Sequence, residues 1–381
     1  MLSDRILLDG TVRARTPEDT WAAIVPELPR YGISRVASLT GLDYLGLPVA
    51  TAIRPASQTL AASQGKGSSP LLAAISAVME AIELWHAEQH RTPALYGPAQ
   101  DIRPPYPLAA LPMKTTWHQA LERMPLEWAL GTGVNSGATI PVPLGLLRRS
   151  AHRTLWQPDI FRATSTGLAC GNARDEALLH GLYEVIERDA LFADELEGGA
   201  RRTLVDPHSV RHPYCRLLVD RLVSAGVVLE TAIVDNAYGI PTCLAYLWTE
   251  DYPLHFAGAG CHTDPHIALA RAITEAAQSR LTCIAGTRDD LPSHEEVFDR
   301  RPPRPPAATG SSLHAWDALM VGHAPWRGSF ADQAVTVAER IEEITGHEAV
   351  CLDLSAPTEP LAAVKVICPG TCSRTRRSIP R

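Results

Sequence analysis

Apolar positions along the chain follow patterns that predict both strands and helices. Stretches rich in Val, Leu, Ile and Ala predict strands at 33–53, 227–248, 349–354 and 362–368, and residues 128–147 predict a strand pair around a Gly-Thr-Gly turn. Long runs of small and apolar residues predict helices at 71–88, 175–196, 266–285 and 332–344. The N-terminal stretch predicts a short strand and then a helix, since Thr16 can cap a helix that Pro17 begins. The proline-rich stretches 101–115 and 291–312 predict loops, so the whole pattern predicts an α/β (α+β) fold.

Glycine-rich segments precede three of the predicted helices. They occupy residues 63–67 (SQGKG), 166–172 (TGLACGN) and 257–264 (AGAGCHTD). We expect each to be a turn, because glycine permits a positive φ and lets backbone amides approach a ligand. The N-terminus of a helix behind such a turn favours an anion. The repeated strand–glycine turn–helix unit therefore predicts a shared phosphate cradle.

Two of these helices carry glutamates three positions apart, Glu80 with Glu83 and Glu184 with Glu187. This spacing places both carboxylates on one helix face. Both helices are apolar nearly all round, so we expect the acids to point into the protein. Buried carboxylates need cations. Magnesium suits them, because it takes a few carboxylates together with phosphate oxygens and water.

Two other interpretations of the glutamates stay open. They can be ordinary solvated acids on helix surfaces, which is the usual place for glutamate. Glu83 and His86 also have the helical spacing of a di-iron ligand pair. A di-iron bundle needs that motif twice, however, and the second helix has Ala190 at the matching position.

Two cationic residues suit contacts with phosphate. Lys66 lies inside the first glycine-rich segment, and Arg271 lies near the start of the third helix, which also carries Glu275 and Gln278. The Walker pattern G-x-x-x-x-G-K-[ST] and the nucleophile elbow G-x-S-x-G do not occur in the sequence. A phosphate site here would therefore be of another kind.

The composition is that of a globular protein and argues against some kinds of partner. Of the 381 residues, 45% are hydrophobic and 20% are charged, an ordinary globular balance, and the net charge of −7 argues against a nucleic-acid partner. We see no signal-peptide pattern and no apolar run of the ~18 residues that a membrane span needs, so we expect a cytoplasmic protein without membrane contact. None of the eight cysteines forms a C-x-x-C pair, so we interpret them as small buried hydrophobes.

Three long motifs together resemble the YcaO family. They are SQGKG (63–67) with SAVMEAIE (76–83), TGLACGNARDEALLHGLYEVIERDA (166–190) and GAGCHTDPHIALARAITEAAQSR (258–280). The resemblance extends from about residue 10 to about residue 370. It implies a YcaO-type fold packed around an ATP site, with ATP and Mg²⁺ as cofactors. It also implies a YcaO domain over 63–370, preceded by a segment of the same fold, 1–62, and followed by a divergent basic tail, 371–381.

The resemblance implies roles for single residues. The family's magnesium-binding glutamates correspond to Glu80, Glu83, Glu184 and Glu187. Its nucleotide contacts correspond to Asn172 and Glu176, its phosphate contact to Arg271, and a basic residue and hydroxyl near the N-terminus to Arg13 and Thr20. Lys66, Arg188, Glu275 and Gln278 complete the candidate ATP contacts, and Glu187 and Arg271 are the candidate catalytic residues.

The resemblance also implies a reaction. Members of the family activate a peptide backbone amide by phosphorylating its oxygen, after which a nucleophile attacks and phosphate leaves. We therefore expect ATP-dependent modification of a ribosomally made precursor peptide. A homodimer is a reasonable expectation for the assembly.

Two departures from the family pattern bear on the product. Leu84 follows Glu83 where the family usually has arginine, and residues 369–381 lack the PxPxP end of many azoline-forming members. The second departure favours thioamide formation with a TfuA-like partner. Azoline formation with an E1-like partner, macroamidine formation, and a non-catalytic module that binds nucleotide or a leader peptide stay open.

Overall fold

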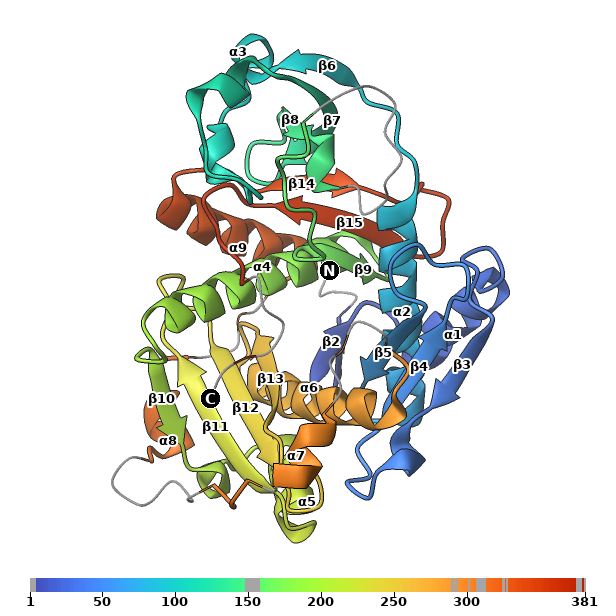
Figure 1. Ribbon diagram of the computed structural model, residues 1–381, viewed down its shortest axis with the longest axis vertical. Helices are drawn as coiled ribbons and strands as arrows, with labels where there is room; N and C mark the ends of the chain where they lie inside the picture. Colours follow the sequence, from blue (N-terminus) through green and yellow to red (C-terminus); the bar gives the residue numbers. More distant parts are fainter. Residues whose placement is uncertain are drawn as a thin grey trace.

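Long helices and antiparallel sheets form the frame of the molecule (Figure 1). The structure is a computed structural model that describes residues 5–147, 158–288, 291, 294–300, 302–305, 313–323, 326, 328–374 and 379. Its three longest helices are α2 (Pro70–Glu88), α4 (Arg174–Leu196) and α6 (Pro265–Ala285). The others are α1 (Pro17–Ile24), α3 (Ala99–Ile102), α5 (Pro213–Ser224), α7 (Glu295–Arg300), α8 (Trp316–Leu319) and α9 (Phe330–Thr345).

The strands form four sheets, and every pairing within them is antiparallel in the described residues. A hairpin pairs β1 (Ile6–Leu8) with β2 (Thr11–Arg13), and a three-stranded sheet has the order β3 (Arg35–Ser38), β4 (Val49–Ile53), β5 (Ala62–Lys66). The four-stranded sheet has the order β10 (Arg202–Val205), β11 (Val228–Val234), β12 (Thr242–Trp248), β13 (Phe256–Cys261). The six-stranded sheet has the order β6 (Leu95–Pro98), β7 (Pro125–Gly133), β14 (Val350–Asp353), β15 (Ala362–Ile367), β9 (Leu168–Gly171), with β8 (Thr139–Pro143) paired to β7.

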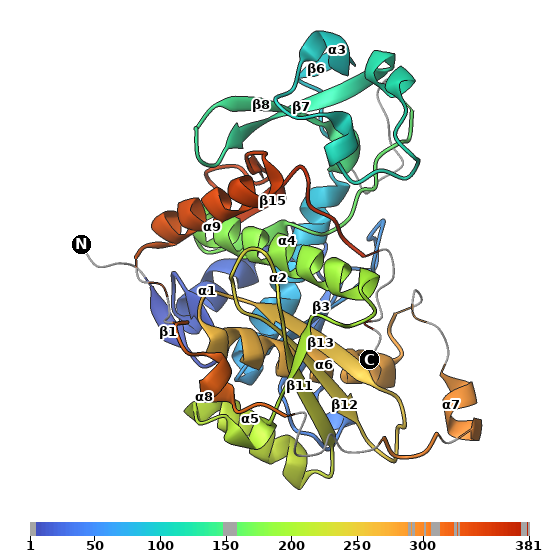
Figure 2. The same ribbon diagram turned by 90° about the vertical axis from the view of Figure 1, so that its left-hand side faces the viewer.

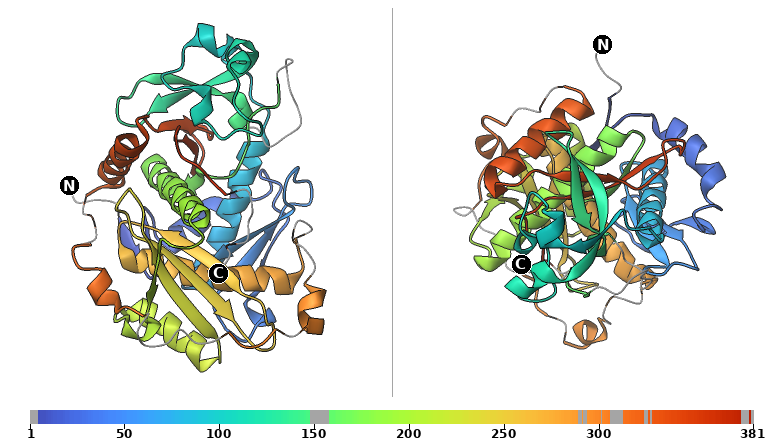
Figure 3. Two further views of the ribbon diagram at one scale, coloured as in Figure 1. Left: turned by 60° about the vertical axis from the view of Figure 1, so that its left-hand side comes forward. Right: turned by 90° about the horizontal axis from the view of Figure 1, so that it is seen from above.

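These elements are stacked along the long axis of the molecule. Strands β6, β7 and β8 with α3 form one end, and the four-stranded sheet with α5 and α6 lies towards the other (Figure 2). Helices α4 and α9 lie between them, and Figure 3 shows α4, in green, crossing the middle of the molecule. Helix α4 packs on β15 and β9 on one side and on α9 along its length. A helix in this position can carry side chains to a site shared by several layers.

The three glycine-rich segments are mostly strands, which corrects the prediction that they are turns, although Gly167 does lie in a turn, with a φ of 76°. They form β5, β9 and β13, and their glycines face the helix that follows. A Cβ atom on Gly65 would lie 2.0 Å from the backbone nitrogen of Ala77, and one on Gly258 would lie 2.2 Å from that of Ala276. Real Cβ contacts are never so short, so glycine is needed because the helix backbone lies directly against the strand.

The strand–helix unit nevertheless occurs three times, and the three units pack into a ring. Helix α2 packs on its own strand β5, α4 on β9 and α6 on β13. Each helix also packs on a strand of another unit, α2 on β9, α4 on β13 and α6 on β5. This closed arrangement brings the three helices around a common centre.

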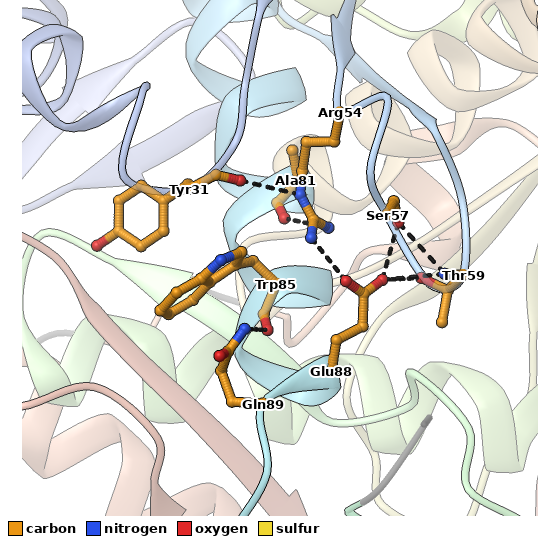
Figure 4. A network of polar contacts seen from close by, with 8 residues as sticks. All are labelled: Tyr31, Arg54, Ser57, Thr59, Ala81, Trp85, Glu88 and Gln89. Atoms are coloured by element: carbon orange, nitrogen blue, oxygen red, sulfur yellow. Dashed lines mark hydrogen bonds and ion pairs between the residues drawn. The ribbon is translucent and has the colours of Figure 1, made fainter. Parts of the chain in front are cut away.

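Two buried charged side chains fix the position of α2 (Figure 4). The Arg54 guanidinium donates to the carbonyl oxygens of Tyr31 and Ala81 and forms a 2.6 Å ion pair with Glu88. The Glu88 carboxylate also accepts hydrogen bonds from Ser57 and from Thr59. Because both charges are paired and hydrogen-bonded, their burial is tolerated and the helix is held in one register.

The predicted helices agree with α1, α2, α4, α6 and α9, and the predicted strands with β3, β4, β11, β12, β14 and β15. Helices α5 and α8 and strands β6 and β10 were missed. Helix α3 shares only residues 101 and 102 with the first predicted loop, and α7 lies in the second, which is only partly within the described residues. The β7–β8 hairpin turns after Gly133 rather than at the Gly-Thr-Gly sequence, which belongs to β7.

Helix α2 bears on the expectation that no segment of the chain spans a membrane. By length and hydropathy it is the one helix, among the described residues, that could cross a membrane. Core helices of soluble proteins pass the same test, and 56% of this stretch is buried inside the molecule. Ala77, Val78 and Ile82 on α2 are completely buried. The feature is therefore weak evidence for a membrane span.

Candidate functional site

The four predicted metal ligands lie on α2 and α4. Glu187 is buried, with 5% of its surface exposed, and Glu80, Glu83 and Glu184 are partly buried. The backbone N–H of Cys170 in β9 donates a 2.8 Å hydrogen bond to Glu83. This contact ties α2 to the strand that precedes α4, so the glutamates of the two helices belong to one structural unit.

The electrostatics show that the glutamates influence one another. Burial raises the pKa of Glu83 well above its ordinary value, and repulsion from Glu184 and Glu80 raises it further. Burial raises the pKa of Glu80 to about 7, although Arg288 and Lys66 oppose the shift. Burial likewise raises the pKa of Glu187 to about 7, against the effect of Arg188. Carboxyl groups with such values near one another form a site that a cation would stabilise.

The donor chemistry of this cluster fits magnesium. Among the described residues, no three His, Cys, Asp or Glu side chains converge closely enough to hold a metal ion by themselves. Magnesium does not need such a cage, because it is usually bound by one or two carboxylates together with phosphate oxygens and water. Glu80, Glu83, Glu184 and Glu187 are therefore suited to share the ion with the phosphates of a nucleotide.

Arg188 lies beside the glutamates of α4. Its guanidinium is 3.7 Å from Glu184 and 3.7 Å from Glu187. Burial alone would lower the pKa of Arg188, but Glu187 and Glu184 raise it, so the side chain stays charged. Arg188 is therefore placed to orient both carboxylates and to offset part of their repulsion.

A second group of predicted residues meets at the start of α4. The buried Glu176 carboxylate accepts hydrogen bonds from the backbone N–H groups of Asn172 and Ala14, both at 3.1 Å, and pairs with Arg13 at 3.3 Å. The Thr20 hydroxyl donates to the Asn172 side-chain oxygen at 2.9 Å. The hairpin β1–β2, helix α1 and helix α4 thus bring Arg13, Thr20, Asn172 and Glu176 together.

The predicted residues of β5 and α6 form a third group. Lys66 makes a 2.8 Å ion pair with Glu275, and the Gln278 amide donates to the carbonyl oxygen of Gln64. Burial alone would raise the pKa of Glu275, but Lys66 and Arg188 lower it. Arg271 acts electrostatically on both Glu187 and Glu275, so it lies towards the glutamate cluster. Cations therefore face the acids from α6, from β5 and from α4 itself.

Several residues of the site were missed by the sequence analysis. The buried Lys365 in β15 donates to the carbonyl oxygens of Thr164 and Thr166, both at 2.7 Å, and it opposes the rise in the pKa of Glu184. A lysine inside the apolar strand AAVKVI was the signal that could have identified it. Arg288 supplies a cation near Glu80, on the helix that lacks the arginine usual after Glu83.

His86 does not join the glutamate cluster through its ring. The ring is buried and lies 3.5 Å from Glu359, whose other oxygen accepts from the backbone N–H of Ala356. Tyr31 donates to the same Glu359 carboxylate at 2.8 Å. The pairing of His86 with Glu359 accounts for this histidine without a redox metal.

Comparisons with known proteins agree with this arrangement. The model of a family described as YcaO cyclodehydratase, binding ATP and Mg²⁺, matches residues 64–372. An uncharacterised protein of Mycobacterium tuberculosis (strain ATCC 25618 / H37Rv) is 36% identical over 379 residues, which cover 95% of this chain and 82% of that protein. An uncharacterised protein of Rhizobium leguminosarum bv. trifolii, named as lying in the tfuA 3′ region, is 34% identical over 374 residues, which cover 94% of this chain and 88% of that protein.

Solved structures share the fold. The structure of YcaO from Methanopyrus kandleri, bound with AMPPCP and Mg²⁺, has a TM-score of 0.73 at 21% identity and covers 97% of this chain and 95% of that chain. A heterocyclase in complex with substrate and cofactor has a TM-score of 0.74 at 20% identity and covers 95% of this chain and 53% of that chain. At these identities the likeness concerns the fold.

Proposed function

Because this chain belongs to the YcaO family, we propose that it uses ATP and Mg²⁺ to activate a backbone amide of a ribosomally made precursor peptide. ATP and Mg²⁺ are the cofactors in the family's description. The observation that supports the proposal in this chain is the glutamate cluster of α2 and α4, with raised pKa values and cations on several sides. Such a cluster is unfavourable alone and favourable around a divalent cation.

Each group of residues has its own part in this proposal. Glu80, Glu83, Glu184 and Glu187 would hold magnesium, with Arg188 orienting the last two. Arg271 and Lys66 would contact the phosphates, because they face the cluster from α6 and β5. The remaining nucleotide contacts would come from Arg13, Thr20, Asn172, Glu176, Glu275 and Gln278.

The chemistry needs positioning more than a dedicated nucleophilic side chain. When bound, MgATP would supply the phosphoryl group that converts the amide oxygen into a good leaving group. The chain's cations would offset the charge that develops on the transferring group, as in other phosphoryl transfers. Glu187 and Arg271 are the proposed catalytic residues, because the charge of Arg271 acts on the buried Glu187 carboxylate and opposes the rise in pKa that burial causes.

We propose thioamide formation with a TfuA-like partner as the specific reaction. In that reaction sulfide attacks the activated carbon, the bond from carbon to the phosphorylated oxygen breaks, and the products are thioamide, ADP and phosphate. The support is the relative whose name places it beside tfuA and which covers 94% of this chain. The modified peptide would gain the mass difference between sulfur and oxygen.

Cyclodehydration is the second candidate, because the family's description names a cyclodehydratase. Here a cysteine, serine or threonine side chain of the peptide would attack, and an azoline would form with net loss of one water. Attack by a terminal amine would give a macroamidine, also with loss of water. Mass spectrometry of a peptide co-expressed with the chain distinguishes a sulfur-for-oxygen exchange from a loss of water.

Glu187→Gln tests the proposed catalytic site. The substitution keeps the size of the side chain but removes a ligand charge, so ATP turnover should fall about a hundredfold while the fold is retained. Turnover is measured as phosphate release from MgATP with the co-expressed peptide present. Glu339→Gln, on the exposed face of α9, is the matched control and should keep the wild-type rate.

Two outcomes would count against the proposal. Full turnover by the Glu187→Gln variant would remove Glu187 from the catalytic site. Absence of phosphate release by the wild-type chain with every peptide and partner would favour a non-catalytic module that binds nucleotide or a leader peptide.

A further inference from the structure

Lys365 is a buried cation in a strand that is otherwise apolar. Only 4% of its surface is exposed, and the strand β15 has the sequence AAVKVI. Burying a charge is costly unless hydrogen bonds and nearby opposite charge stabilise it. The Lys365 ammonium donates to the carbonyl oxygens of Thr164 and Thr166, both at 2.7 Å. Burial raises the pKa of Glu184, and Arg188 and then Lys365 oppose that rise. The lysine is therefore tied to one short segment and acts on one of the candidate magnesium ligands.

The segment that Lys365 holds is the turn 164–167, which leads into β9. Gly167 ends this turn with a φ of 76°, a conformation that residues other than glycine rarely adopt. Its carbonyl oxygen accepts a 2.7 Å hydrogen bond from the backbone N–H of Val366. A Cβ atom on Gly167 would lie 2.4 Å from the Val366 carbonyl oxygen, so the turn lies directly on β15. Two hydrogen bonds from Lys365 and one from Val366 thus fix the turn on this strand.

The same segment contacts candidate ligands on both helices. The backbone N–H of Gly167 donates a hydrogen bond to Glu184 on α4. Three positions later, the backbone N–H of Cys170 donates to Glu83 on α2 at 2.8 Å. Strands β9 and β15 are paired with each other, and both pack on α4 (Figure 1). The position of this segment on β15 therefore decides where both N–H groups point.

We propose that Lys365 is a positioning residue of the magnesium site, which holds the turn 164–167 on β15 so that two backbone N–H groups orient Glu184 and Glu83. The inference rests on the proposed function, because it takes these two glutamates to be magnesium ligands. Groups that orient the ligands of a metal change its affinity by about 10- to 100-fold. Lys365 thus acts on the metal through the glutamates and needs no contact with the nucleotide.

The concentration of Mg²⁺ needed for half-maximal binding of AMPPCP tests this role. Calorimetric titration of the full chain at a fixed AMPPCP concentration measures it without any peptide. Lys365→Met keeps the length of the side chain but removes its charge and its donors, so we expect the Mg²⁺ requirement to rise about tenfold. Lys365→Arg keeps a charge and N–H donors, and its requirement should stay within about threefold of wild type.

Val364→Ala is the matched control for damage to the same strand. Val364 is completely buried in β15, so the smaller side chain should lower the unfolding midpoint. It should leave the Mg²⁺ requirement unchanged, because the hydrogen bonds of Lys365 are retained. Lys365→Gln, with a neutral and polar side chain, gives a second answer if the methionine variant does not fold, and it should raise the requirement to a similar extent.

Hydrogen exchange of the wild-type chain gives an answer that needs no variant. Binding of AMPPCP with Mg²⁺ should slow the exchange of the Gly167 and Cys170 amides, because the carboxylates that accept from them become fixed. Unchanged exchange at both amides would overturn the link between this segment and the metal site.

Wild-type Mg²⁺ requirements in the methionine and glutamine variants would overturn the role of Lys365 and leave the proposed function standing. A rise in Val364→Ala as large as that in Lys365→Met would also overturn it, since a general loosening of β15 would then explain the effect. An equal rise in Lys365→Arg would do the same, because that variant keeps the charge and the donors. Failure of the wild-type chain to bind AMPPCP with Mg²⁺ would overturn the proposed function as well.

Discussion

At the scale of single residues, the chain holds carboxyl groups in surroundings that disfavour their charge. Burial raises the pKa of Glu80 and of Glu187 to about 7, from an ordinary value of 4.5. Between these values the folded chain binds protons more tightly than the unfolded chain does. The free energy of unfolding without metal should therefore fall as pH rises from 4.5 through 7, because the buried carboxyls must then ionise.

Magnesium should oppose that trend, because it competes with protons for the same carboxylates. We expect Mg²⁺ with AMPPCP to raise the unfolding midpoint more at about pH 8 than at about pH 6. Differential scanning calorimetry at the two pH values, with and without the ligand, measures the difference. In the double variant Glu80→Gln with Glu187→Gln, most of this difference between the two pH values should disappear. An equal stabilisation of the wild-type chain at both pH values would contradict the proposal that Glu80 and Glu187 bind the metal.

The spacing of residues in the sequence was enough to predict some members of the candidate site but not others. Glu80 with Glu83 and Glu184 with Glu187 were recognisable because a local pattern on an apolar helix implies inward acids. Lys365 could be noticed as a lysine within an apolar strand, but its partners could not be predicted, since its hydrogen bonds reach Thr164, 201 positions away in the sequence. Contacts of that range depend on how sheets assemble, which no local pattern encodes.

At the scale of elements, glycines in the strands allow the long helices to pack directly against them. The long helices were predictable from runs of small residues, but the glycine-rich segments were for the most part wrongly interpreted as turns. Glycine favours a turn when φ must be positive, and it is equally needed in a strand that another backbone approaches closely. The sequence does not distinguish these cases until the partner of the strand is known.

Gly65→Ala tests this explanation. The new Cβ atom would lie 2.0 Å from the Ala77 nitrogen, so either α2 or β5 must move, and we expect the free energy of unfolding to fall by about 3 kcal/mol. Gly41→Ala is the matched control, because nothing lies within 4 Å of its added Cβ atom and its change should stay within about 0.5 kcal/mol. Urea denaturation measures both values, and a small loss for Gly65→Ala would show that the contact relaxes easily.

At the scale of the whole molecule, the candidate site exists only when the three strand–helix units close into their ring. Arg13 meets Glu176 across 163 positions of sequence, and Lys66 meets Glu275 across 209. Helix α2, which carries two of the glutamates, is held by Arg54 and Glu88 outside the site. The fold thus provides the rigidity that a site of repelling charges needs before its ligand arrives.

The central claim is that glutamates on α2 and α4 together hold magnesium and a nucleotide. Calorimetric titration with AMPPCP, with and without Mg²⁺, tests it on wild type, Glu83→Gln, Glu187→Gln and the control Glu339→Gln. We predict that wild type and the control bind only with Mg²⁺, and that each site variant binds at least about tenfold more weakly. Equal binding by wild type without Mg²⁺, or unchanged affinity in both site variants, would contradict the claim.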